Sequence, residues 1–177
     1  MPIMGIIASS ILKRSGAFYL IQQLTPSSVS TVTFNSIPAI YKSLHIRLNL
    51  VCSTAGSHFG VQFNGDTAAN YAYHVLLGYN NSAYTAYGAI TKSNIQLSAL
   101  DLTVDTYPNV GIIDVIDYAS TNKNKTTKSI FAENNNTGAG EIEMDSGLWL
   151  STSAVNSLTL LVGAGTFTGT VSLYGIS

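Results

Sequence analysis

The sequence has little charge for its length. Of its 177 residues, 8 are basic and 9 are acidic, so charged residues make up 10% of the chain, against about 25% in an average soluble domain. The formal net charge of −1 excludes a nucleic-acid binder that works through a basic face. A free monomer usually keeps itself soluble with more charge than this. The shortage therefore predicts that much of the surface contacts other protein.

Cysteine and long apolar runs are also scarce. The single cysteine, Cys52, excludes a disulfide within the chain and a cysteine-based zinc site. No stretch approaches the run of about 18 or more apolar residues that a membrane helix requires. We therefore expect neither a disulfide framework nor a membrane partner.

Residues 1–16 read MPIMGIIASSILKRSG, in which the aliphatic residues precede Lys13 and Arg14. A secretory signal has the reverse order, with its charge before the apolar run. We expect an N-terminal arm in residues 1–16 and a single domain in residues 17–177. Large aliphatic side chains would be costly to leave in water, so the arm is predicted to dock on a neighbouring subunit. Its expected anchors are Ile6, Ile7, Ile11 and Leu12.

Strand patterns occupy most of the remaining chain. Residues 44–52 alternate, with Leu44, Ile46, Leu48, Leu50 and Cys52 on one face and His45, Arg47 and Asn49 on the other. This period of two is typical of a strand with one buried face. Further candidates are residues 18–24, 29–34, 59–63, 71–79, 90–97, 111–118, 125–132, 141–144, 148–150, 158–162 and 167–174. Short strands with regular turn signals predict an all-β fold, a jelly-roll-like antiparallel β-sandwich. One such signal is Asn64-Gly65-Asp66, which favours positive φ angles.

Residue patterns for catalysis or metal binding are absent from the sequence. The three histidines, His45, His58 and His74, have no partner at the spacing of metal ligands. Asp114 and Asp117 lie at an odd separation in a predicted strand, so they point to opposite faces and form no carboxylate pair. No nucleophile elbow or phosphate-binding loop is present. We therefore expect no enzyme activity, no cofactor and no metal site.

Two charged groups call for an interpretation. Glu141, Glu143 and Asp145 alternate, so they share one face of a strand. A solvated face or a protected sheet edge is the favoured role, and calcium binding is the alternative. The other group is a predicted solvated basic loop, formed by Lys123, Lys125 and Lys128.

Tyrosine is frequent, with ten in the chain, and five of them lie between Tyr71 and Tyr87. Tyrosine is favoured at interfaces because it has an apolar ring and a polar tip. One hypothesis makes Tyr79, Tyr84 and Tyr87 interface or ligand contacts. The other places these tyrosines in packing at the rim of the sandwich.

Three stretches together are similar to one family: FNGDTAANYAYH (63–74), VGIIDVIDYASTNKNKTTKSI (110–130) and SGLWLSTSAVNSLTLLVGAGTFTGTVSLYGI (146–176). They resemble small virion structural proteins of tailed bacteriophages. The resemblance implies a virion location and a jelly-roll sandwich. The resemblance implies no catalytic activity, because none of the motifs in these three stretches is a catalytic motif.

Two functions are compatible with this reading. The first is a capsid decoration, or cement, protein, which is predicted to form a homo-oligomer, a trimer, and to clamp neighbouring subunits of the major capsid protein. The alternative is a receptor-binding or carbohydrate-binding module of a tail or fibre, which the tyrosine cluster and the Asn-rich loops would serve.

Overall fold

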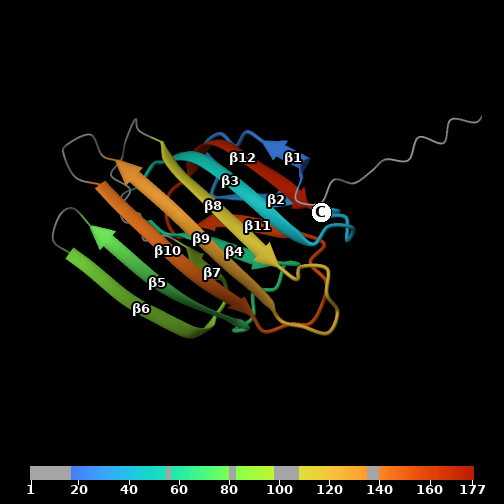
Figure 1. The fold of residues 1–177 in the computed structure, drawn as a ribbon. Coiled ribbons are helices and arrows are strands. Elements are labelled where there is room, and N and C mark those ends of the chain that lie inside the picture. Colours follow the sequence, from blue (N-terminus) through green and yellow to red (C-terminus); the bar gives the residue numbers. More distant parts are fainter. Residues whose placement is uncertain (1–16, 55–56, 80–82, 98–107, 135–139) are drawn as a thin grey trace, which may run out of the picture.

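The computed structural model describes residues 17–54, 57–79, 83–97, 108–134 and 140–177, and it arranges them as two antiparallel sheets (Figure 1). The larger sheet has eight strands, in the spatial order β1 (Phe18–Leu24), β12 (Phe167–Ile176), β3 (Ser43–Cys52), β8 (Asn109–Ile116), β9 (Lys125–Asn134), β10 (Gly140–Trp149), β5 (Tyr71–Tyr79) and β6 (Ala83–Lys92). The smaller sheet has four strands, in the order β2 (Thr31–Phe34), β11 (Leu158–Val162), β4 (Phe59–Phe63) and β7 (Ile95–Leu97). No helix occurs in these residues. The predicted all-β antiparallel sandwich is confirmed.

The chain passes back and forth between the two sheets. From β2 to β5 it alternates at every step, and it returns to the smaller sheet at β7 and again at β11. Alternation of this kind is typical of jelly-roll-like sandwiches. As a result, several neighbouring strands of the larger sheet come from distant parts of the sequence, namely β1 and β12, β12 and β3, β3 and β8, and β10 and β5.

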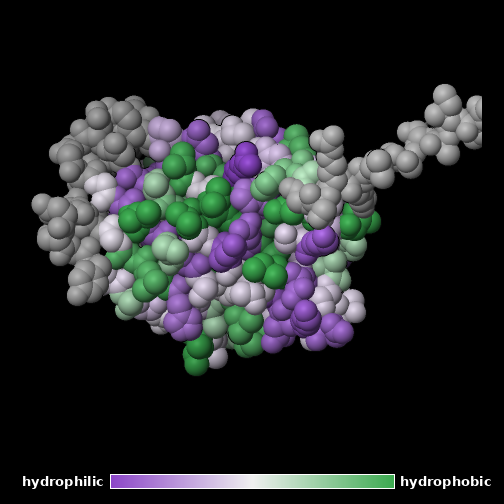
Figure 2. Space-filling view, in the orientation of Figure 1, coloured by the Kyte–Doolittle hydropathy of each residue, from purple (hydrophilic) through white to green (hydrophobic). Residues whose placement is uncertain are grey.

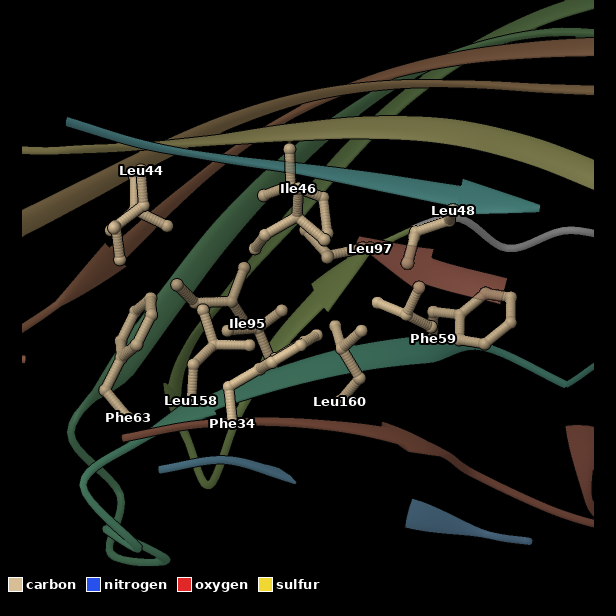
Figure 3. Packing of buried hydrophobic residues seen from close by; sticks show 14 of the residues in the cluster. Phe34, Leu44, Ile46, Leu48, Phe59, Phe63, Ile95, Leu97, Leu158 and Leu160 are labelled. Atoms are coloured by element: carbon tan, nitrogen blue, oxygen red, sulfur yellow. The ribbon is translucent and has the colours of Figure 1, made fainter. Parts of the chain in front are cut away.

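The core lies between the sheets and is built from the alternating strands. Leu44 and Ile46 of β3 are fully buried, as the period of two predicts, and they face Phe59 and Phe63 of β4 and Leu160 of β11 (Figure 3). These residues belong to one continuous cluster of buried hydrophobic side chains. Burying such side chains contributes roughly 1.5–3 kcal/mol each, so this interface between the sheets is the main source of stability.

The predicted turn at Asn64-Gly65-Asp66 is present and connects the two sheets. Asn64 and Gly65 have φ angles of 53° and 68°, the left-handed region that Asn and Gly tolerate best. The Asp66 carboxylate accepts hydrogen bonds from Trp149 Nε1 at 2.8 Å, Asn70 Nδ2 at 3.0 Å and the Ala68 backbone N–H at 2.9 Å. Trp149 is the last residue of β10. The Asp66 carboxylate therefore connects the turn after β4 to the C-terminal end of β10 in the larger sheet.

Several strand bounds differ from the sequence-based prediction by one or two residues, and in two places the division into strands differs. β6 begins at Ala83, whereas the pattern indicated a single strand over residues 90–97; that stretch is divided between β6 and β7, which lie in different sheets. β10 is one continuous strand, whereas the pattern indicated two strands separated at residues 145–147. A Cβ atom at Gly147 would lie 2.3 Å from Ile95 Cγ2. Glycine is therefore the residue that lets β7 pack against β10 near its C-terminal end.

Candidate interaction face

The outer face of the larger sheet has an inverted polarity over β10. In this strand, Ile142 and Met144 point outward and are 56% and 52% exposed, whereas Glu141, Glu143 and Asp145 point inward and are buried. Sheets with one solvated face normally place apolar residues inward and polar residues outward. The reversal indicates that the outer face is built for contact with something other than water.

The exposed apolar residues of neighbouring strands lie side by side. Ile112 of β8 is opposite Ile130 of β9, which is opposite Met144 of β10, which in turn is opposite Leu76 of β5. All of these, with the adjacent residues Val110 and Ile142, are between 40% and 60% exposed. We call this group the outer apolar patch; its members are Leu76, Val110, Ile112, Ile130, Ile142 and Met144.

Figure 2 shows the patch as a cluster of apolar side chains over β8, β9 and β10, bordered by a band of polar ones. Contiguous apolar patches rimmed by polar residues mark interaction surfaces on soluble proteins. The arrangement therefore fits a surface that binds another protein.

A groove of about 820 Å³ runs across the strands between the patch and this polar band. Its apolar side is formed by patch residues, including Ile130 and Met144, and its polar side by Asp114, Lys128, Ser146 and His74. The polar residues form one row, because Asp114 pairs with Lys128, Lys128 with Ser146 and Ser146 with His74 in the sheet register. A ligand here would meet apolar contacts on one side and hydrogen-bonding groups on the other.

The polar row continues into a network around His45. His45 Nδ1 hydrogen-bonds to Asp114 Oδ1 at 2.6 Å, and Lys128 Nζ lies 3.4 Å from Asp114 Oδ2. Arg47 Nε donates to His45 Nε2 at 3.3 Å. Because Nε2 accepts a hydrogen bond, the imidazole proton is on Nδ1 and is donated to the aspartate.

Aromatic rings enclose this network. The His45 ring lies 4.9 Å from the Phe18 ring, and the Arg47 guanidinium lies 5.0 Å from the Tyr174 ring. His45 is therefore buried although its strand position predicted a solvent-facing side chain. Both imidazole nitrogens already have partners, so the His45–Asp114 pair lacks the free nitrogen that a general base needs. The network is suited to holding strands β3, β8 and β9 together.

The acidic row on β10 is not solvated, contrary to the favoured prediction. Glu141, Glu143 and Asp145 lie on the inner face, and Asp145 accepts a hydrogen bond from Ser129 Oγ at 2.9 Å. The prediction was wrong because alternation indicates which residues share a face but not which face is buried. Within the described ranges, no cluster of three or more His, Cys, Asp and Glu side chains has the arrangement of a metal site.

The three lysines do not form one basic loop. Lys123 pairs with Asp117 at 3.1 Å, and Lys128 lies on the outer face. Lys125 is fully buried, and its ammonium donates to the carbonyl oxygens of Ser151 at 3.4 Å and Thr152 at 3.2 Å. Burial lowers the pKa of Lys125. The predicted solvated loop is thus wrong for Lys125, which anchors the loop after β10.

The predicted interface residues fall in different places. Ile6, Ile7, Ile11 and Leu12 lie outside the described residues. Tyr79 and Tyr84 lie at the adjoining ends of β5 and β6, where Gly78 pairs with Tyr84, and their side chains are outside the described part. Tyr87 is half-buried opposite Val75 on the inner face, where burial, Glu143 and Asp145 raise its pKa to about 12. Tyr71 and Tyr73 are buried core residues.

The sequence analysis did not identify the outer apolar patch. The signal was present in β8, whose sequence NVGIIDVI carries aliphatic residues on both faces. A strand that is apolar on both faces is expected to be covered on both sides. Alternation in this stretch predicts a strand, and its second apolar face is the signal for the patch.

Comparison of the chain with protein-family models, curated proteins and solved structures finds no match. The described part of the chain has no helix that could cross a membrane.

Proposed function

We propose that this chain is a non-enzymatic structural protein of a bacteriophage virion, a capsid decoration protein that forms a homo-oligomer and clamps neighbouring capsid subunits. The observation that carries the proposal is the outer apolar patch, a group of exposed apolar side chains on the larger sheet whose chemistry suits a protein partner. The low charge of the chain and the resemblance of its sequence motifs to small virion proteins support the same reading.

The chemistry of the outer apolar patch and of the polar row beside it suits a protein partner. Exposed Met and Ile side chains contribute through burial, and the adjoining row of Asp114, Lys128 and His74 supplies polar contacts at the rim. An apolar centre with a polar rim is the common anatomy of protein interfaces. In this proposal, the patch contacts the capsid shell, and residues 1–16 add a second attachment through their aliphatic side chains.

A pair of matched variants tests the role of the patch. Met144→Asp places a charge in the middle of the patch, whereas Ile40→Asp makes the same type of change at a residue that is 60% exposed outside the larger sheet. We expect Met144→Asp to weaken binding to purified phage particles about tenfold or more, because burying such a side chain contributes roughly 1.5–3 kcal/mol. Ile40→Asp should bind like the wild type. Equal binding by both variants would refute a role for the patch.

Copy number distinguishes the two virion roles. A decoration protein is present in purified particles in numbers comparable to the capsid subunits, and quantitative mass spectrometry measures this ratio directly. A copy number comparable to that of tail fibres would instead support the receptor-binding module. Absence of the chain from purified particles would refute both.

A further inference from the structure

The two sheets have four edges, and three of them are protected against pairing with another strand. The smaller sheet ends in β2 and β7, which have 4 and 3 residues. In the larger sheet, the pairing of the edge strand β1 is interrupted by a register shift between Leu20 and Gln22. Short edge strands and bulges are the devices by which natural proteins prevent association through open sheet edges.

The fourth edge, β6, carries such a device only near its C-terminal end, where a register shift interrupts its pairing with β5 at residues 90–91 and Thr91 has a φ angle of 56°. Residues 83–89 have neither a shift nor a charge. The strand has 10 residues, and its pairing with β5 runs without a shift from Ala83 to Ala89. None of residues 83–91 is charged, and the strand contains no proline. In Figure 1, β6 is the outermost strand of the larger sheet, and among the described residues no strand pairs with its free side. A long, uncharged edge presents a row of backbone N–H and C=O groups to any matching strand.

We propose that β6 pairs in antiparallel fashion with β6 of a second copy of this chain, about a two-fold axis near Ala86. Ala86 is the middle residue of the regularly paired segment, residues 83–89. An antiparallel pair of identical strands is self-complementary, which is the requirement for a two-fold interface. The net charge of −1 causes little repulsion between the copies.

The neighbouring side chains favour a second copy as the occupant. Ala86 and Gly88 are small and exposed on the outer face, so they leave room there for the side chains of a paired strand. Leu76 of the outer apolar patch lies directly beside Ala86 in the sheet. Pairing through β6 therefore joins the patches of two copies into one longer apolar surface across a continuous sheet.

This contact is independent of the role in the virion, because it depends only on β6. It also differs from the trimer expected from the sequence, since a two-fold contact links copies in pairs. A chain that fails to bind particles can still pair through β6, and a monomeric chain can still bind particles through the patch. The two proposals are therefore tested separately.

The first experiment measures self-association of the full chain by sedimentation velocity. A double variant, Thr85→Lys with Ala86→Lys, places lysines on both faces of β6, where like charges of two copies would lie opposite each other and oppose pairing. The matched control, Gln22→Lys with Gln23→Lys, makes the same change on the opposite edge strand. All four positions are exposed, and circular dichroism checks that both variants are folded.

We expect the wild type and the β1 variant to associate at micromolar concentration and the β6 variant to associate at least about tenfold more weakly. A wild type that stays monomeric at high micromolar concentration would overturn the proposal. An oligomer that the β6 lysines leave unchanged would overturn it as well.

The second experiment locates the axis by cross-linking. Cys52 is buried, and burial raises the pKa of its thiol to about 12, so it does not compete with an introduced cysteine. Oxidation of Ala86→Cys should yield a covalent dimer through a disulfide between the two copies, whereas Gln22→Cys should not. Equal cross-linking of both variants, or none at Ala86→Cys, would overturn the proposed pairing.

Discussion

Replacing Asp66 with alanine should destabilise the fold, although the residue lies in a turn between strands. The substitution removes the acceptor for three hydrogen bonds, including the 2.8 Å bond from Trp149 Nε1. Trp149 is only 2% exposed, so its indole N–H would be left with no acceptor in a buried site, at a cost of about 1–3 kcal/mol. Adding the bonds from Asn70 and Ala68, we expect Asp66→Ala to lower the free energy of unfolding by about 3 kcal/mol.

Thermal and urea denaturation of the full chain measure this effect. A loss of about 3 kcal/mol corresponds to a decrease in Tm of roughly 6–12 °C for a domain of this size. A double-mutant cycle with Trp149→Phe isolates the indole hydrogen bond, and we expect a coupling of about 1–3 kcal/mol. Asp66→Asn is the matched control, since it keeps the shape and one acceptor oxygen and should cost less.

The pH dependence gives an independent check. Hydrogen bonds from Asn70 and Trp149 lower the pKa of Asp66 in the folded state, so the carboxylate stabilises the fold above its unfolded-state pKa of about 3.9. This contribution is lost as the pH falls through the lower, folded-state pKa. The stability difference between the wild type and Asp66→Asn should therefore be constant near neutral pH and shrink in strong acid. Additive effects of Asp66→Ala and Trp149→Phe, or a difference that grows in acid, would refute the reasoning.

Three further substitutions test the core and the outer face by the same denaturation assays. Leu48→Asp buries an unpaired charge between the sheets and should cost several kcal/mol, about 3 or more, or prevent folding; a stable variant would contradict the core assignment. His45→Ala removes the 2.6 Å hydrogen bond to Asp114 and should lower the free energy of unfolding by about 1–3 kcal/mol. An unchanged free energy of unfolding would show that this hydrogen bond does not stabilise the fold. Gly111→Ala should cost about 1–3 kcal/mol by overpacking, because a Cβ there would lie 2.4 Å from the Phe131 ring; a neutral effect would mean that this ring is free to move.

The sequence predicted strands well where each strand has one apolar face. The observed bounds of β1, β4, β5 and β11 agree with the predicted ranges. In β4 and β11 the side chains facing the opposite sheet are large and apolar, so the period of two is complete. In these two strands, the alternation of apolar side chains was enough to predict the local structure.

Prediction failed where packing between strands replaces this pattern. β6 carries small residues and glycine in place of alternating large ones, and its strand conformation follows from pairing with β5. β10 was divided at Gly147, whose role depends on the approach of Ile95 from β7. Neither contact between distant residues is visible from local periodicity.

The outer face could be predicted only in part. The aliphatic residues of β8 were recognised as strand-forming, but the location of the patch depends on the strand order, which brings β8, β9, β10 and β5 together. The same order decides which face of β10 is buried. The burial of His45 likewise depends on Phe18 and Tyr174, which belong to two other strands.

The inverted polarity of β10 also has a consequence for how the chain folds. A slip of one residue in the pairing of this strand would exchange its two faces, turning Ile142 and Met144 inward and the acidic residues outward. In most strands, hydrophobic burial opposes such a slip along the whole strand. In β10, burial of Ile142 and Met144 would favour the slip, and only the burial of Trp149 opposes it. The correct alignment must therefore be selected by Gly147, which alone admits Ile95, and by Trp149, which finds its acceptor only at Asp66. Substitutions at these two positions would then produce misaligned, aggregation-prone chains during refolding, in addition to a less stable native state.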